Sequence, residues 1–304
     1  MTAATEAPAP RHGAHRHEAK LRQLELVVTR RLDGLLHGDH QGLVPGGGSE
    51  PDDGRMYDPG DDVRRMDWNL TARSGYPHVR NTVADRELEL WLVVDGSASL
   101  DFGTATCEKR DLVLAAAAAF GFLTARDGNR IGALLFGPEG SEVLPPRSGR
   151  APLFGLLARL ERRDRAGEGT ASLADALRRA RLTARRRSLV VVISDLIDSG
   201  PWARELRALA SRHHVVVAEI RDPREAELPH VGLLTLVDPE TGRRLEVQTA
   251  SPKVRARFAT AAAAALAERE RAVKSAGAGH LVLSTDRDWV LDVVRFVAAR
   301  RRRR

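Results

Sequence analysis

Short apolar segments alternate with longer helical segments through most of this chain, and this alternation restricts the fold more than any other feature. The run at 189–194 is continuously apolar up to its final serine, as in strands buried on both faces of a parallel sheet. Strands are also predicted at 88–94, 130–136, 214–220 and 280–284, and helices at 108–126, 152–162, 172–185, 202–212, 253–275 and 289–300. The pattern predicts an α/β fold built on a doubly wound, mostly parallel sheet.

Two segments are expected to fold back as antiparallel pairs. Residues 141–144 follow strand 130–136 after a Gly-Pro-Glu-Gly turn, so they pair with that strand. Residues 233–237 and 244–248 flank the turn sequence Pro239-Glu240-Thr241-Gly242, which predicts a β-hairpin.

The N-terminal quarter has a different character. Apolar residues at helical spacing (Leu21, Leu24, Val28, Leu32 and Leu35) predict a helix over 18–36. Residues 38–83 show no clean periodicity and are rich in Gly, Asp, Arg and Pro. Their bulky residues, among them Met56, Trp68 and Tyr76, favour an irregular module held by polar contacts over a flexible linker. We therefore divide the chain into a disordered tail (1–18), a helix and irregular module (19–85), the α/β domain (86–300) and a basic tail (301–304).

Bulk properties narrow the classes of function. The net charge of +7 suggests a nucleic-acid partner, but the arginines lie scattered among acidic residues, and only four of the 48 basic residues are lysines. The apolar run at 112–125 is too short to span a membrane, which takes about 20 residues. The single cysteine, Cys107, excludes an intrachain disulfide and fits a reducing compartment. We expect a cytoplasmic protein without a membrane span.

Oxygen-bearing side chains follow two of the predicted strands. Asp95, Ser97 and Ser99 come directly after strand 88–94, and Asp195 comes after strand 189–194. Thr170 lies just before the helix at 172–185. Because ligands collect outside the carboxyl ends of parallel strands, these groups are expected to meet at one edge. Hydroxyl and carboxylate oxygens suit a hard cation, so we predict a site for Mg²⁺, with Mn²⁺ and Ca²⁺ as alternatives.

Each of these residues also has a simpler interpretation. Ser97 and Ser99 could cap a turn or helix, and that alternative stays open for the Asp-x-Ser-x-Ser sequence taken alone. Asp198 could support the ion through water, but we expect it to cap the helix that begins near Trp202.

The same residues carry a resemblance to a known class of domain. Asp95-x-Ser97-x-Ser99 with Thr170 and Asp195 resembles the metal-ion-dependent adhesion site of von Willebrand factor A domains. The preceding segment is similar to the signature of the DUF58 family, which places it before such a domain. The matching residues are Gly42, Gly46 to Glu50, Arg55 to Tyr57, Pro59 to Arg64, Met66 to Trp68, and Ala72-Arg73.

The resemblance implies a function in protein binding rather than catalysis. It implies that Ser97, Ser99 and Thr170 bind the metal directly, and that Asp95 and Asp195 act directly or through water. A Glu or Asp carboxylate of a partner protein would fill the remaining position. The family's association with MoxR-type AAA+ ATPases implies that the partner is such an ATPase. This sequence departs from the pattern at Leu100, where the family often has Met, and at Pro51 to Asp53, where an aromatic residue often follows Glu50.

An enzyme is the main alternative. Asp95 could act as a nucleophile in a phosphatase or other hydrolase, but such phosphatases carry a second Asp two positions later, where this chain has Ser97. No lysine partner is evident at a matching strand end, no Gly-x-Ser-x-Gly elbow occurs, and no phosphate loop ends in Gly-Lys-Ser/Thr. An arginine-mediated nucleic-acid binder is the third possibility.

Overall fold

The computed structural model describes residues 21–32, 55–58, 63, 66–79, 89–125, 128–162, 172–198 and 200–302. The predicted tail at 1–18 and the site residue Thr170 lie outside these ranges. The whole segment between the first helix and Arg55, residues 33–54, lies outside them as well.

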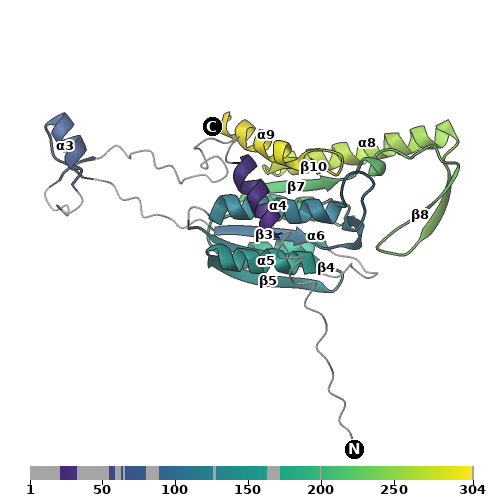
Figure 1. Ribbon diagram of the computed structural model, residues 1–304, viewed down its shortest axis with the longest axis horizontal. Helices are drawn as coiled ribbons and strands as arrows, with labels where there is room; N and C mark the ends of the chain where they lie inside the picture. Colours follow the sequence, from purple (N-terminus) through teal and green to yellow (C-terminus); the bar gives the residue numbers. More distant parts are fainter. Residues whose placement is uncertain are drawn as a thin grey trace, which may run out of the picture.

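A six-stranded sheet forms the centre of the α/β domain (Figure 1). Its strands are β3 (Glu89–Asp95), β4 (Arg130–Gly137), β5 (Gly140–Ser148), β6 (Leu189–Ser194), β7 (His214–Arg221) and β10 (Gly279–Ser284). They lie in the order β10-β7-β6-β3-β4-β5, and every neighbouring pair is parallel except β4 with β5. The predicted doubly wound, mostly parallel fold is confirmed, and β3 and β6 are neighbours at its centre.

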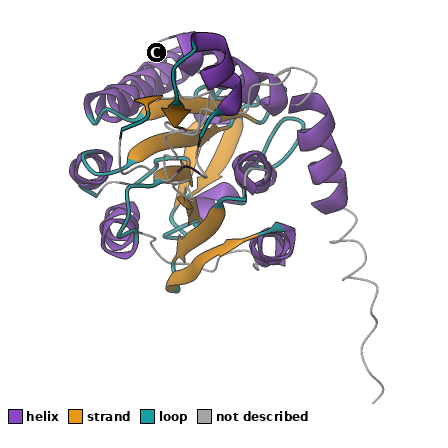
Figure 2. Cartoon of the chain, turned by 90° about the vertical axis from the view of Figure 1, so that its left-hand side faces the viewer, coloured by secondary structure: helices purple, strands orange, loops and turns teal. Residues whose placement is uncertain are grey.

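Helices cover both faces of the sheet, as Figure 2 shows. On one face pack α4 (Lys109–Ala125), α5 (Arg150–Arg162), α9 (Trp289–Arg302) and the N-terminal helix. On the other pack α6 (Leu173–Thr183), α7 (Trp202–Ala210) and α8 (Pro252–Ser275). Strand β3 is buried throughout because Leu90, Leu92 and Val94 face the first layer, whereas Trp91 and Val93 face the second.

Most predicted elements occur at their expected positions. The hairpin strands β8 (Leu233–Val237) and β9 (Arg244–Gln248) have the predicted bounds. Strand β5 is longer than expected, and α9 continues to Arg302, two residues into the predicted basic tail. The N-terminal helix is described over 21–32, and its last turn, Val28–Leu32, is a π-helix. None of the helices in the described ranges is long and apolar enough to cross a membrane.

The irregular module contains a small folded unit that the sequence analysis missed. Strands β1 (Arg55–Met56) and β2 (His78–Val79) pair antiparallel, and α3 (Trp68–Ser74) lies between them. Asp67 caps α3 by accepting hydrogen bonds from two backbone amides, and Gly75 ends it at a φ of 75°. The bulky side chains are not packed as expected: Trp68 is 68% exposed and Tyr76 61% exposed. A two-turn helix without a buried face leaves such side chains in solvent.

Candidate metal centre

Strand β3 carries Asp95 to the carboxyl edge of the sheet, where its side chain is buried. One carboxylate oxygen accepts a 2.8 Å hydrogen bond from the Ser97 amide, and the other accepts a 2.6 Å bond from the Ser194 hydroxyl. Burial, followed by the negative charge of Asp195, raises the pKa of Asp95 to about 7. Asp95 is therefore a carboxylate whose ionised form lacks sufficient positive charge nearby.

The two serines of the loop face the same point as the aspartates. Their hydroxyl oxygens lie 3.0 Å apart, and Ser99 donates a 2.7 Å hydrogen bond to Oδ2 of Asp195. Ser97 stands at the N-cap of the 3-10 turn Ala98–Leu100, yet its side chain makes no capping hydrogen bond. Both hydroxyls thus belong to the polar cluster, and the capping alternative fails for Ser97.

Asp195 enters the cluster from the end of β6 and is 3% exposed. Its Oδ1 accepts a hydrogen bond from the Ile197 amide at 3.1 Å. The intervening Leu196 has a φ of 57°, which is a strained conformation for a buried leucine. A hydrogen bond that the Leu196 amide donates to the Ser194 hydroxyl at 3.0 Å stabilises this backbone conformation.

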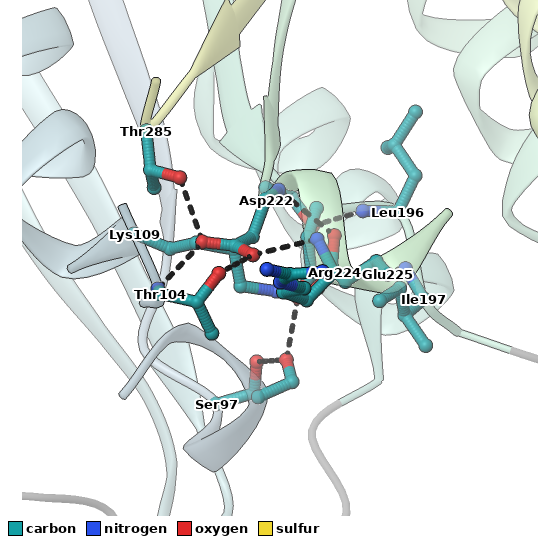
Figure 3. A network of polar contacts seen from close by, with 12 residues as sticks. Ser97, Thr104, Lys109, Leu196, Ile197, Asp222, Arg224, Glu225 and Thr285 are labelled. Atoms are coloured by element: carbon teal, nitrogen blue, oxygen red, sulfur yellow. Dashed lines mark hydrogen bonds and ion pairs between the residues drawn. The ribbon is translucent and has the colours of Figure 1, made fainter. Parts of the chain in front are cut away.

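Lys109 is the functional residue that the sequence analysis missed. From the first turn of α4, its Nζ lies 2.7 Å from Oδ2 of Asp195 and 2.5 Å from Oε1 of Glu225, and its side chain is fully buried (Figure 3). Burial lowers the pKa of Lys109, but the charges of Asp195 and Glu225 outweigh it and leave the pKa above its ordinary value. Lys109 comes from a helix and pairs with Asp195, so a search for lysines at matching strand ends does not find it. The rarity of lysine is a sequence signal that could have identified Lys109, because the chain has only four lysines.

A second network anchors the loop that precedes Lys109. Asp222 accepts hydrogen bonds from the Thr104 amide at 2.8 Å, the Thr104 hydroxyl at 2.6 Å and the Thr285 hydroxyl at 2.7 Å (Figure 3). Thr106 donates from its hydroxyl to the Thr285 carbonyl. These contacts join the loop after β3 to the ends of β7 and β10, which fixes the approach of Lys109 to Asp195.

Asp198 has a different role from the expected one. Its Oδ2 accepts a 2.7 Å hydrogen bond from the Leu173 amide at the start of α6, and its Oδ1 accepts one from the Gly200 amide at 2.6 Å. It therefore binds the first amide of α6, whose N-cap is Ser172, and does not cap the helix beginning at Trp202. Four of the five predicted metal ligands, Asp95, Ser97, Ser99 and Asp195, lie in one cluster; the fifth, Thr170, precedes α6 outside the described residues.

The chemistry of this donor set fits a hard divalent cation. The hydroxyl oxygens keep free lone pairs, and the formal charges of Asp95, Asp195, Glu225 and Lys109 sum to −3 + 1 = −2. Among the described residues no group of three or more His, Cys, Asp or Glu side chains is placed to hold a metal. The site therefore depends on hydroxyls, which suits Mg²⁺ better than a soft metal.

The strand order, with one antiparallel edge strand and the Asp-x-Ser-x-Ser loop at the end of the first central strand, defines a von Willebrand factor A-like domain. Residues 53–268 match the family described as "Protein of unknown function DUF58". This chain belongs to the DUF58 family.

Relatives in mycobacteria extend the match over nearly the whole chain. Uncharacterized proteins of Mycobacterium tuberculosis and Mycobacterium bovis are each 53% identical over 285 residues, which is 93% of this chain and 90% of the relative. Among solved structures, the conserved hypothetical protein BatB from Bacteroides thetaiotaomicron is 16% identical with a TM-score of 0.44, covering 71% of this chain and 99% of BatB. The von Willebrand factor A domain of SpRpn10 is 12% identical with a TM-score of 0.39, covering 68% and 93%.

Proposed function

We propose that this protein is a non-catalytic, metal-dependent protein-binding module. Ser97, Ser99 and Thr170 would bind a divalent cation directly, with Mg²⁺ as the first candidate, and Asp95 and Asp195 would act directly or through water. The observation that supports this most is the cluster formed by Asp95, Asp195 and the two serine hydroxyls, with a formal charge that a divalent cation balances.

The bound ion would supply an electrophilic position for a carboxylate. Ser97 and Ser99 are neutral ligands, so they leave more of the ion's charge uncompensated than carboxylates would. Lys109 holds Asp195 and neutralises part of its charge, which keeps Asp195 from competing fully with an incoming acid. The partner is therefore a protein that presents a Glu or Asp side chain, and a MoxR-type AAA+ ATPase is the candidate that the family relationship suggests.

Metal binding can be tested directly. The full chain, stripped with EDTA, is titrated with Mn²⁺ while free Mn²⁺ is followed by electron paramagnetic resonance. We expect the double variant Ser97→Ala/Ser99→Ala to bind Mn²⁺ at least about tenfold more weakly than wild type. Ser211→Ala is the matched control, because that exposed hydroxyl bonds only its own helix end in the described contacts. Equal affinity in all three proteins would contradict the proposal.

Partner binding needs a second measurement. The MoxR-type ATPase of the same genome is immobilised, and wild type and Ser97→Ala/Ser99→Ala are passed over it in Mg²⁺ and in EDTA. We expect binding in Mg²⁺ only, and only for wild type. Binding that persists in EDTA would show that the ion does not hold this partner.

The hydrolase alternative has weaker support. Lys109, the buried cation of the site, pairs with Asp195 and Glu225 rather than with Asp95. A nucleophilic Asp95 would need a nearby cation for the transferred group. Turnover of p-nitrophenyl phosphate that is abolished in Asp95→Asn would support the hydrolase instead.

A further inference from the structure

A pocket of about 510 Å³ opens beside the candidate metal centre, outside the carboxyl ends of β7 and β10. Two of its lining residues connect it to that centre (Figure 3). Glu225 pairs with Lys109, and the Ile197 amide donates to Oδ1 of Asp195. Helix α8 forms one wall, and the volume suits a small molecule. The apolar lining consists of Ile197, Ala262, Ala265, Leu266 and Val282.

Two arginines form a polar wall of this pocket. Arg221 ends β7 and Arg269 belongs to α8, and both contact the fully buried Glu219. Arg221 donates to Oε2 of Glu219 at 2.6 Å, and Nε of Arg269 lies 3.3 Å from Oε1. His280 contacts the same carboxylate at 2.7 Å. Glu219 therefore holds both guanidinium groups in place before a ligand arrives, which reduces the entropy cost of binding.

The charges of this cluster do not balance. Two guanidinium groups face the single carboxylate of Glu219, and with His280 neutral the sum is +2 − 1 = +1. Nε of Arg221 is buried, and none of the described residues accepts a hydrogen bond from it. Guanidinium groups bind carboxylates and phosphates through charge-assisted hydrogen bonds. The arginine wall therefore suits an anion.

The other charged groups of the lining decide which anion fits. Asp222 and Glu225 also line the pocket, and the Asp222 amide donates to Glu225 at 3.1 Å. Asp286 and Arg287 are exposed neighbours of opposite charge, so together they add no net charge. A carboxylate carries one negative charge, which balances the arginine wall. A phosphate monoester carries about −1.5 to −2 charges and would bring surplus negative charge close to two carboxylates.

We propose that this pocket binds a small organic carboxylate with an apolar body. The carboxylate pairs with Arg221 and Arg269, and the apolar body lies against Ala262 and Leu266 on α8. This inference goes beyond the proposed function, because it requires neither the metal ion nor the protein partner. Its tests are therefore made in EDTA, and their failure would leave the proposed function standing.

Octanoate is the probe, because it joins one carboxylate to an apolar chain. It is titrated into the full chain in EDTA at pH 7, and binding is followed by saturation-transfer difference NMR. We expect octanoate to bind at least about tenfold more tightly than 1-octanol or octyl phosphate. Equal binding of 1-octanol would reduce the site to apolar surface, and tighter binding of octyl phosphate would overturn the choice of a carboxylate. Absence of octanoate binding would overturn the proposal as a whole.

A pair of variants on α8 locates the binding site without changing any charge. Ala262→Phe places a ring in the pocket, whereas Ala263→Phe places the same ring at the next position, which is exposed and outside the lining. We expect Ala262→Phe to bind octanoate at least about tenfold more weakly and Ala263→Phe to match wild type. Equal affinity in the two variants would mean that octanoate binds elsewhere.

A second pair tests the role of the arginine wall. Arg269→Gln removes a guanidinium group from the pocket, and Arg271→Gln removes an exposed one from the same helix. We expect Arg269→Gln to weaken octanoate about tenfold and Arg271→Gln to leave it unchanged. Binding of 1-octanol should be the same in both. Unchanged octanoate affinity in a folded Arg269→Gln would remove this arginine from the site, and if that variant does not fold, the two alanine variants decide.

Discussion

Asp95 and Asp222 lie at the same edge of the sheet and are both buried, but their surroundings differ. Burial raises the pKa of Asp222, yet hydrogen bonds from Thr104, Thr285 and the Arg224 amide outweigh it and leave the pKa below the ordinary value. Asp95 also accepts hydrogen bonds, but burial and the charge of Asp195 raise its pKa to about 7. The Asp222 carboxylate is stabilised by neutral donors and holds loops together, whereas the Asp95 carboxylate faces another carboxylate and keeps a negative charge that a cation would balance.

The largest effect on stability is expected from removing Lys109, the positively charged side chain beside Asp195. Lys109→Met leaves the buried Asp195 and the partly buried Glu225 without their shared partner, so we expect a loss of about 3–5 kcal/mol in the free energy of unfolding. Urea denaturation at pH 8 in EDTA measures it. Lys274→Met, which removes an exposed pair with Glu270, should leave the midpoint unchanged. Equal stability of wild type and Lys109→Met would mean that Lys109 is not needed to balance the carboxylates.

Asp222→Ala tests the saturated carboxylate. It leaves the Thr104 amide and two threonine hydroxyls without their acceptor, so we expect a loss of about 2–3 kcal/mol in urea denaturation at pH 7. Because the folded-state pKa of Asp222 lies below its unfolded value, this contribution is present above pH 3.8 and lost as the pH falls through the folded-state pKa. Mg²⁺ should not change the difference. A difference that disappeared in Mg²⁺ would place Asp222 in the metal centre.

Asp95→Asn tests the other carboxylate. Its pKa is raised rather than lowered, so its effect on stability depends on pH with the opposite sign. The folded-state pKa is raised to about 7 from 3.8, so metal-free wild type loses stability as the pH rises between these values. In EDTA at pH 8 we expect Asp95→Asn to be more stable than wild type by about 1–2 kcal/mol, and the gap to narrow toward pH 5. Thermal denaturation across this range measures the gap. A gap that stayed constant with pH would rule out a raised pKa.

The smallest loss of stability is expected when the hydroxyl of Ser97 or Ser99 is removed. Ser99→Ala removes the hydrogen bond to Asp195 and should cost about 1 kcal/mol in EDTA. Ser97→Ala should cost less, because the Ser97 hydroxyl contacts the Ser99 hydroxyl and makes the weakest of the hydrogen bonds that lower the pKa of Asp95. Differential scanning calorimetry of the two variants measures this order. Adding Mg²⁺ should raise the melting temperature of wild type and of neither variant. An equal rise in all three proteins would mean that the hydroxyls of Ser97 and Ser99 do not bind the ion.

Elements with strong local patterns could be predicted from the sequence. The hairpin bounds are correct because alternating residues flank a Pro-Glu-Thr-Gly turn, and β6 is correct because its apolar run is continuous. Helix α3 was missed because its seven residues have no buried face, so the sequence marks it only by its end residues, Asp67 and Gly75.

The roles of Asp198 and Lys109 depend on contacts between residues far apart in the sequence, so the sequence pattern did not predict them. Asp198 lies 25 residues from the amide that it caps and only a few from the helix that it was expected to cap. Lys109 lies 86 residues from Asp195, and no spacing rule connects a helix's first turn with the end of another strand. The Asp-x-Ser-x-Ser loop was recognisable because its members are close in sequence and follow a strand.

The contacts of Thr285 have a consequence for how the protein is made. Thr106 and Cys107 contact the Thr285 carbonyl, and the Thr285 hydroxyl shares Asp222 with Thr104. During synthesis, the loop after β3 therefore leaves the ribosome long before the residue that anchors it. The edge of the sheet that holds Asp95 is therefore complete only after the chain has been translated past Thr285.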